Sequence, residues 1–145
     1  NEPFGHVQGI TVDNSGSIYV TEPFFNMIRK ISPYGDVSTI AGSTTAQIGY
    51  VDGPEEIALF NQPDDIVVDE EGNVFVTDMS NNVIRKISTT GIVSTFAGSN
   101  ISGYQNGSAE QAKFNSPRGL AFNSASNTLY VADANNHKIR EIIQE

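Results

Sequence analysis

The chain has 145 residues, 38% of them hydrophobic and 17% charged, a composition typical of one folded domain with its own core. The formal net charge of −9 disfavours nucleic acid and anionic membranes as partners, because binding to phosphate-rich surfaces needs a basic face. The absence of cysteine excludes disulfides, thiolate metal sites and a cysteine nucleophile. No apolar run reaches membrane-spanning length, and no signal-peptide pattern occurs in the sequence.

The first third of the chain predicts four short strands separated by polar turns. The expected strands cover 9–13, 17–21, 27–31 and 37–41, and they are rich in β-branched and aromatic residues. The turn after the first strand contains Asn14 and Gly16, which tolerate the left-handed backbone that a tight hairpin requires. We call the four strands of such a unit a, b, c and d.

The rest of the chain repeats this unit. GNVFVTDMSNNVIRKISTTGIVSTFAGS, residues 72–99, resembles residues 16–43, and a shorter version follows at 128–143. Val20, Val76 and Val131 occupy equivalent places. Strands are therefore expected at 66–68, 74–76, 83–87 and 92–97, then at 120–122, 129–131 and 138–143, with no fourth strand in the last unit. Insertions that fall only in turns indicate stacked supersecondary units.

Two longer linkers, 43–63 and 99–117, join the units and match each other in sequence. Each is expected to hold one helical turn, since Pro54 suits a first helical position and Ser108 begins a capping-box spacing. Phe60 and Phe114 follow these turns and are expected to fill the gap between neighbouring units. Four-stranded units in series predict an all-β protein, a β-propeller with little helix.

The repeated pattern P-x-[GD]-[IL]-x-[VF]-[DN], then G-x-[IV]-[YF]-V-[TA]-[DE]-x-x-x-N-x-I-R-[KE]-I, resembles the NHL repeat in its extracytoplasmic form and covers nearly the whole chain. The resemblance implies a propeller of usually six blades, of which this chain would supply half. The expected single segment 1–145 contains blade 1 at about 4–43, blade 2 at about 60–99 and a partial blade 3 at about 114–145, which lacks its outer strand. Either two chains close a 3+3 ring as a homodimer, or the chain is a piece of a longer one. The resemblance also implies an extracellular or periplasmic location.

In a meander of this kind the b–c turns and the linkers lie on one common face, where we expect binding. Phe24 and Phe25 stand in the first b–c turn, where the other units have the polar pairs Ser80-Asn81 and Asn135-Asn136. We interpret the two aromatic residues as a contact patch for a partner, the alternative being that they pack on the neighbouring linker.

Asp64 and Asp65 precede an inner strand, near the place where the central channel of a propeller opens. A cation or a basic group of a partner is one reading, and a solvated acidic loop is the other. His6 is expected on the same rim, although His6 and Asp65 alone are too few ligands to hold a metal. Arg118 completes the set of candidate binding residues, and no residue is assigned as catalytic or as a metal ligand.

The repeated Asp78 and Asp133 are interpreted as caps of tight turns rather than ligands. Arg29, Arg85 and Arg140 lie on the c strands and are expected to pair with a turn carboxylate.

Two functions follow from the resemblance. The first is a non-catalytic binding or interaction scaffold without a cofactor, whose partner is a protein, a peptide or a small ligand at the channel mouth. The second is a metal-dependent hydrolase or lyase of the NHL-like propeller type, with a divalent cation in the channel.

Overall fold

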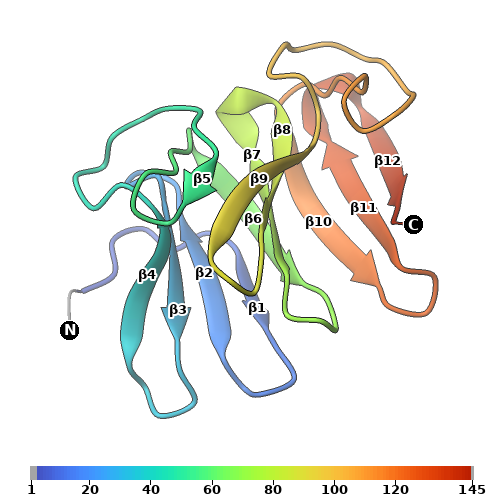
Figure 1. The fold of residues 1–145 in the computed structure, drawn as a ribbon. Coiled ribbons are helices and arrows are strands. Elements are labelled where there is room, and N and C mark those ends of the chain that lie inside the picture. The colour runs from blue at the N-terminus through green and yellow to red at the C-terminus, as the bar shows by residue number, and fades with distance from the viewer. Residues whose placement is uncertain (1–2, 145) are drawn as a thin grey trace.

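The computed structural model describes residues 3–144, which form three antiparallel sheets arranged as successive blades (Figure 1). The blades run from blue through green and yellow to red, in the order of the chain. Within this described range no helix approaches the length and apolarity needed to cross a bilayer.

Blade 1 is a four-stranded meander in which each strand pairs with the next along the chain. Its strands are β1 (Ile10–Val12), β2 (Ile18–Glu22), β3 (Met27–Ile31) and β4 (Val37–Gly42). All four lie within two residues of their predicted bounds. Gly16 has φ of +87°, which confirms that the first hairpin needs a left-handed residue.

Blade 2 contains the predicted meander and one strand more. Its strands are β6 (Pro63–Val68), β7 (Val74–Asp78), β8 (Val83–Ile87) and β9 (Ile92–Ala97). The first linker adds the short strand β5 (Gly53–Pro54), which pairs with the outer strand β9 and was not predicted. A two-residue strand leaves no periodic pattern in a sequence, so only the fold could show it.

Blade 3 has the strands β10 (Pro117–Asn123), β11 (Thr128–Asp133) and β12 (Lys138–Ile143). In the described part of the chain no strand follows β12, as the repeat predicted. The sheet therefore ends at β12, whose outer edge has no neighbouring strand within residues 3–144.

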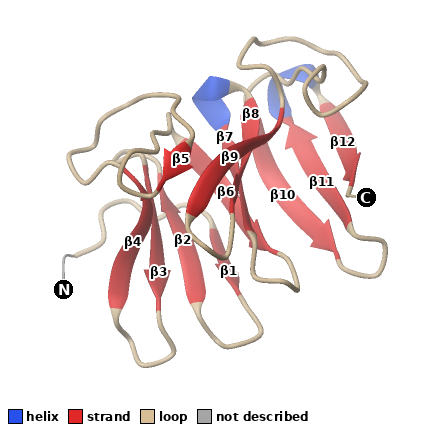
Figure 2. Cartoon of the chain, viewed as in Figure 1, coloured by secondary structure: helices blue, strands red, loops and turns tan. Residues whose placement is uncertain are grey.

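The linkers contain the predicted single turns but no assigned helix. The amide of Ala58 donates to the carbonyl of Pro54 at 3.0 Å, and Ala112 donates to Ser108 at 2.9 Å. The short 3₁₀-helices lie instead in the b–c turns, as η1 (Met79–Asn81) and η2 (Ala134–Asn136). Figure 2 shows these turns and the long linkers at one end of the molecule, opposite the a–b hairpins.

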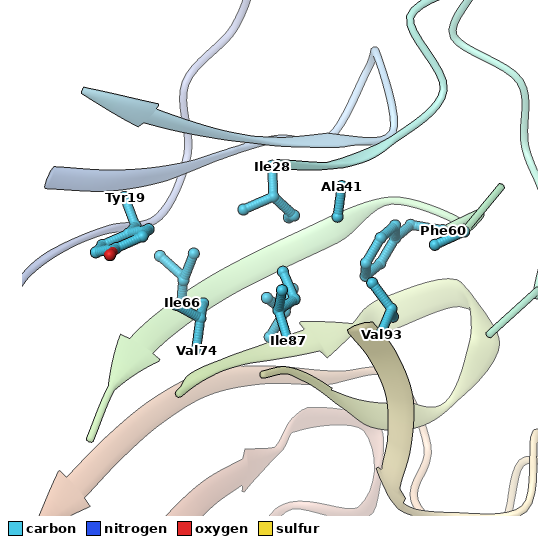
Figure 3. Close-up of a cluster of buried hydrophobic side chains, with 10 residues drawn as sticks. Tyr19, Ile28, Ala41, Phe60, Ile66, Val74, Ile87 and Val93 are labelled. Carbon is cyan, nitrogen blue, oxygen red and sulfur yellow. The ribbon is translucent and has the colours of Figure 1, made fainter. Parts of the chain in front are cut away.

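Two apolar clusters hold the three blades together. Between blades 1 and 2, Tyr19, Ile28 and Ala41 face Ile66, Val93 and the ring of Phe60 (Figure 3). Between blades 2 and 3, Phe114 packs with residues of both blades in the same way. Phe60 and Phe114 are both buried, which confirms that they fill the gap between blades.

The two outer faces of the assembly are open. Ile28 and Ile84 are fully buried between blades, whereas Ile139, at the same place in blade 3, is 73% exposed. Ile10 in blade 1 is likewise exposed, although the equivalent Ile66 is buried. Each outer face thus presents apolar positions that a neighbouring blade covers elsewhere in the chain.

Candidate functional site

The inner strands begin with an irregularity that brings the candidate residues together. Pairing of β6 with β7 is interrupted between Pro63 and Ile66, and pairing of β10 with β11 between Pro117 and Leu120. Asp64 and Asp65 lie in the first interruption, and Arg118 lies in the second. A bulge of this kind frees backbone groups from the ladder and redirects the side chains beside it.

Threonine hydroxyls on the b strands satisfy these freed backbone groups. Thr77 Oγ1 accepts the amide of Asp65 at 2.9 Å and donates to the carbonyl of Arg118 at 2.6 Å. Thr21 repeats this one blade earlier, accepting from Gly9 at 2.8 Å and donating to the carbonyl of Asp64 at 2.6 Å. Each hydroxyl therefore links the inner strand of its own blade to the inner strand of the next blade, which fixes how the two strands are aligned with each other.

These bonds place Gln8, two residues before β1, at the position equivalent to Asp64 in β6 and Arg118 in β10. Arg118 Nη1 lies 3.9 Å from Asp64 Oδ1, and the Arg118 side chain is more than half exposed. Burial raises the pKa of the Asp64 carboxyl, an effect that Arg118 opposes and the neighbouring Asp65 reinforces. The row thus has the carboxyl group of Asp64 at its centre, the guanidinium of Arg118 at one end and the amide of Gln8 at the other.

Asp65 is engaged inside the protein. Its Oδ1 accepts the amide of Ile66 at 2.9 Å, and its Oδ2 accepts the amide of Leu120, in the next blade, at 2.8 Å. Gly9 and Gly119 stand at the same position in the other blades. The Asp65 carboxylate thus links the inner strands of blades 2 and 3. Its role in binding a cation or a partner stays a prediction.

The Asp and Arg that recur in blades 2 and 3 form a buried ion pair that also binds the preceding linker. Arg85 Nη1 donates to Asp78 Oδ2 at 2.7 Å and to the carbonyl of Leu59 at 2.8 Å, while its Nη2 donates to Asp52 Oδ1 at 2.7 Å. Its guanidinium lies 4.7 Å from the centre of the Phe60 ring. The predicted pairing of the c-strand arginines with turn carboxylates is confirmed.

The interpretation of Asp78 and Asp133 as turn caps was wrong. Neither side chain makes a capping hydrogen bond to its 3₁₀-helix. Asp78 Oδ1 accepts the amide of Asn61 in the preceding linker, and Oδ2 accepts from Asn81 Nδ2, both at 2.8 Å. Because the Asp78 carboxylate is fully buried, its strongest partner is the positively charged Arg85, seven residues further along the chain.

Blade 1 departs from this arrangement. Glu22 replaces the aspartate, pairs with Arg29 at 3.0 Å and accepts the amide of Gly5. Phe25 stands where Asn81 and Asn136 bond to the carboxylate and to the linker. The ring of Phe25 lies directly over Gly5, where a Cβ atom would collide with it.

An exposed aromatic cluster results, made of His6, Phe24 and Phe25. Phe24 is 68% exposed and Phe25 is 41% exposed. The ring centres of His6 and Phe24 are 5.0 Å apart, and His6 Nε2 lies 3.3 Å from Gln8 Oε1. The cluster is therefore linked through Gln8 to the row of inner-strand residues that continues with Asp64 and Arg118.

The structure thus brings the candidate residues into two adjoining groups, the aromatic cluster and the Gln8–Asp64–Arg118 row. Sequence reasoning missed Gln8, Thr21 and Thr77. The two threonines recur at the same place in consecutive repeats, which was a usable signal, whereas Gln8 shares no residue type with Asp64 or Arg118. Within residues 3–144, no three His, Asp or Glu side chains form a group that could hold a metal ion.

Successive antiparallel meander blades, joined by linkers whose phenylalanines are buried between them, define a β-propeller, of which residues 3–144 are a run of three blades. Residues 114–142 match the model of the NHL repeat. Blades 1 and 2 share the strand pattern and the buried Arg–carboxylate pair of this matched segment, so all three blades are similar to the NHL repeat.

Known proteins show the same architecture over longer chains. A Bacteroides thetaiotaomicron protein of unknown function is 30% identical, with a TM-score of 0.80 over 88% of this chain and 32% of its own. An auxiliary nutrient binding protein from Bacteroides ovatus is 24% identical, with a TM-score of 0.82 over 94% of this chain and 37% of its own. In sequence, the Arabidopsis thaliana protein SUPPRESSOR OF QUENCHING 1, chloroplastic, is 40% identical over 57% of this chain and 8% of its own length.

The fold is also shared with an enzyme. A gluconolactonase from Xanthomonas campestris is 15% identical, with a TM-score of 0.65 over 94% of this chain and 44% of its own. At that identity the likeness concerns the fold alone. This chain spans about a third of the first two structures.

Proposed function

We propose that the chain is a binding segment of an NHL-repeat propeller, which captures a peptide or protein partner on the face formed by the b–c turns and linkers. The aromatic cluster of His6, Phe24 and Phe25 holds an apolar or aromatic side chain of the partner. The adjoining Asp64–Arg118 pair bonds polar groups of its backbone or a nearby charge.

The observation that carries this proposal is the substitution of Phe24 and Phe25 for residues that the other blades use to hold themselves together. In blade 2 the equivalent Ser80 bonds Gln62 at 2.6 Å, and Asn81 bonds Gly49 and Asp78. Blade 1 forgoes those bonds and exposes two rings instead. Exposed aromatic residues beside polar groups are the usual centre of a protein-binding surface.

The double substitution Phe24→Ser with Phe25→Asn tests the proposal, since it restores the side chains of blade 2. The variant is expected to fold with an unchanged urea midpoint and to lose at least tenfold in affinity for partners captured by the unaltered chain. The matched control is Tyr34→Ser, because Tyr34 is an exposed aromatic residue in a c–d turn at the opposite end. Equal retention of partners by both variants would rule the cluster out.

We extend the proposal to the assembly and its location. The open outer faces are covered either by a second copy, closing a 3+3 ring, or by further blades of a longer chain. Light scattering on a sizing column separates the two, since a dimer supports the ring of two copies and a monomer supports a longer parent chain. We place the protein outside the cytoplasm, in an extracellular or periplasmic setting, following its resemblance to the extracytoplasmic form of the repeat.

The metal-dependent hydrolase or lyase is the second candidate. Its support is the propeller fold shared with the gluconolactonase, and Asp64, beside Arg118 at the start of the inner strands, is the carboxylate it would use. Metal analysis of the purified protein, followed by lactone hydrolysis assays with and without a chelator, tests it. Stoichiometric metal and chelator-sensitive turnover would replace the binding proposal by this one.

A further inference from the structure

A cavity of about 370 Å³ lies between blades 1 and 2, at the end of the molecule that carries the a–b and c–d turns. Tyr19, Lys30 and Ile40 form its wall on blade 1, and Val74 and Ile87 belong to its wall on blade 2. Figure 3 shows Tyr19 of blade 1 opposite Val74 and Ile87 of blade 2. Both blades contain all four strands of the repeat, so the cavity is formed by two consecutive and complete meanders.

The cavity corresponds to one difference between the repeats. Phe96 stands in blade 2 where Ile40 stands in blade 1, and Phe75 is the counterpart of Tyr19. The rings of Phe75 and Phe96 pack edge to face, with their centres 4.9 Å apart. Because isoleucine lacks the volume of a phenylalanine ring, the space that this aromatic pair fills between blades 2 and 3 stays open between blades 1 and 2. The opening is therefore a property of the blade 1 sequence at an interface inside the protein.

Lys30 gives the cavity a positive charge without a partner. The side chain is half-buried, and none of the ion pairs formed within residues 3–144 includes it. Its Nζ lies 5.4 Å from the centre of the Tyr19 ring. A cation–π contact of this kind replaces only part of the hydration that an ammonium group loses on burial. The cavity therefore favours a ligand that brings a negative charge.

The equivalent lysine of blade 2 has different surroundings. Lys86 lines a separate cavity between blades 2 and 3. The lining of that cavity also contains three carboxylates, those of Asp69, Glu70 and Glu71. These groups balance the lysine and repel an anion. The cavity between blades 1 and 2 has a single acidic residue in its lining, Glu55. Of the two equivalent lysines, Lys30 is thus the one beside which an anion can bind.

We propose that this cavity binds a small aliphatic carboxylate. The carboxylate group of the ligand pairs with the ammonium group of Lys30, and its hydrocarbon part lies against Ile40, Val74 and Ile87. The hydroxyl group of Thr89, in the c–d turn of blade 2, also lines the cavity and can donate to the second carboxylate oxygen. Cavities of this size, with apolar walls and a few polar groups, are typical of small-molecule sites.

A single negative charge fits the lining better than a phosphate or a dicarboxylate. The lining contains one lysine and one glutamate, so a second negative charge on the ligand would have no partner. An uncharged aliphatic molecule would leave the Lys30 ammonium group unpaired. The site is separate from the aromatic cluster, which lies in a b–c turn at the opposite end of the molecule. Failure of either proposal therefore leaves the other intact.

The test titrates the whole chain with hexanoate and follows binding by calorimetry and by amide chemical shifts. Saturable binding is expected with a dissociation constant of about 1 mM or tighter, with shift changes at Tyr19, Lys30 and residues 88–91. Hexanamide has the same body without the charge, and acetate has the charge without the body, so each should bind about tenfold more weakly or less. Absence of saturable hexanoate binding, or equal binding of hexanamide, would overturn the proposal.

Changes in the protein provide the second arm. Lys30→Met keeps an unbranched stem beside Tyr19 but removes the charge, and it should weaken hexanoate binding by about tenfold or more. The matched change Lys86→Met should leave hexanoate binding unchanged. Ile40→Phe copies the residue of blade 2 and is expected to fill the cavity and abolish binding. If Ile40→Phe fails to fold, the two lysine variants decide. Hexanoate binding that persists in Lys30→Met, or that falls equally in Lys86→Met, would overturn the proposal.

Discussion

The b–c turns of blades 1 and 2 occupy the same place in the repeat but have opposite roles. In blade 2, Asp78, Asn81 and Arg85 bind the preceding linker through several buried hydrogen bonds. In blade 1, Glu22 and Arg29 keep one ion pair, and the turn exposes Phe24 and Phe25 instead. All three blades keep the buried ion pair, whereas the rest of the turn differs between them, so the ion pair is the part of the turn that the scaffold requires.

The largest loss in the free energy of unfolding is expected from replacing Arg85, which bonds both the Asp78 carboxylate and the preceding linker. Arg85→Met leaves the Asp78 carboxylate buried without its positive partner and should cost about 3–5 kcal/mol in the free energy of unfolding. Arg29→Met removes fewer hydrogen bonds and should cost about 1.5–3 kcal/mol. Urea unfolding of both variants measures the difference. Equal losses would mean that the linker contacts of Arg85 contribute little.

The second comparison uses one aromatic position in two blades. Phe60→Ala removes a ring that is fully buried between blades and should cost about 3–5 kcal/mol. Phe4→Ala, at the same position of the repeat but 40% exposed, should cost about 1 kcal/mol. Thermal and urea unfolding provide the measurement. A Phe4→Ala loss as large as that of Phe60→Ala would show that the open face of blade 1 is covered in solution.

Removing a threonine hydroxyl that links two inner strands is expected to lower the free energy of unfolding by a smaller amount. Thr77→Val keeps the shape but leaves the amide of Asp65 and the carbonyl of Arg118 without their partner, which should cost about 1–3 kcal/mol. Ala132 stands at the equivalent place in blade 3. Ala132→Thr should therefore change stability by less than about 0.5 kcal/mol. A strong gain from Ala132→Thr would indicate a further inner strand beside β10.

The smallest effect concerns pH. Because the folded-state pKa of Asp64 is raised above 3.8, the folded state holds this proton more tightly than the unfolded one. Its contribution to stability is fully present below pH 3.8 and is lost as pH rises through the raised pKa. Asp64→Asn should flatten this part of the stability curve, as measured by urea midpoints between pH 3 and 7. An unchanged curve would show that another group titrates there.

The sequence predicted the order and type of the meander strands in all three blades, although not the additional short strand β5. A repeat with β-branched runs and glycine turns at fixed spacing leaves few other arrangements, and insertions confined to turns confirmed that the units stack. β3, β8, β9 and β12 coincide with their predicted bounds. The buried rings of Phe60 and Phe114 were predictable for the same reason, since each follows a linker and precedes an inner strand.

Which polar residues support the fold could be seen only from contacts between segments that are far apart in the sequence. Asp64 and Asp65 are adjacent carboxylates in the sequence, yet one pairs with Arg118 and the other bonds two backbone amides across blades. The short strand β5 was equally invisible in the sequence, because it depends on pairing with β9, about forty residues further along the chain. Local pattern fixes strands through backbone preference, whereas the role of a polar side chain depends on which distant backbone groups lie within hydrogen-bonding reach.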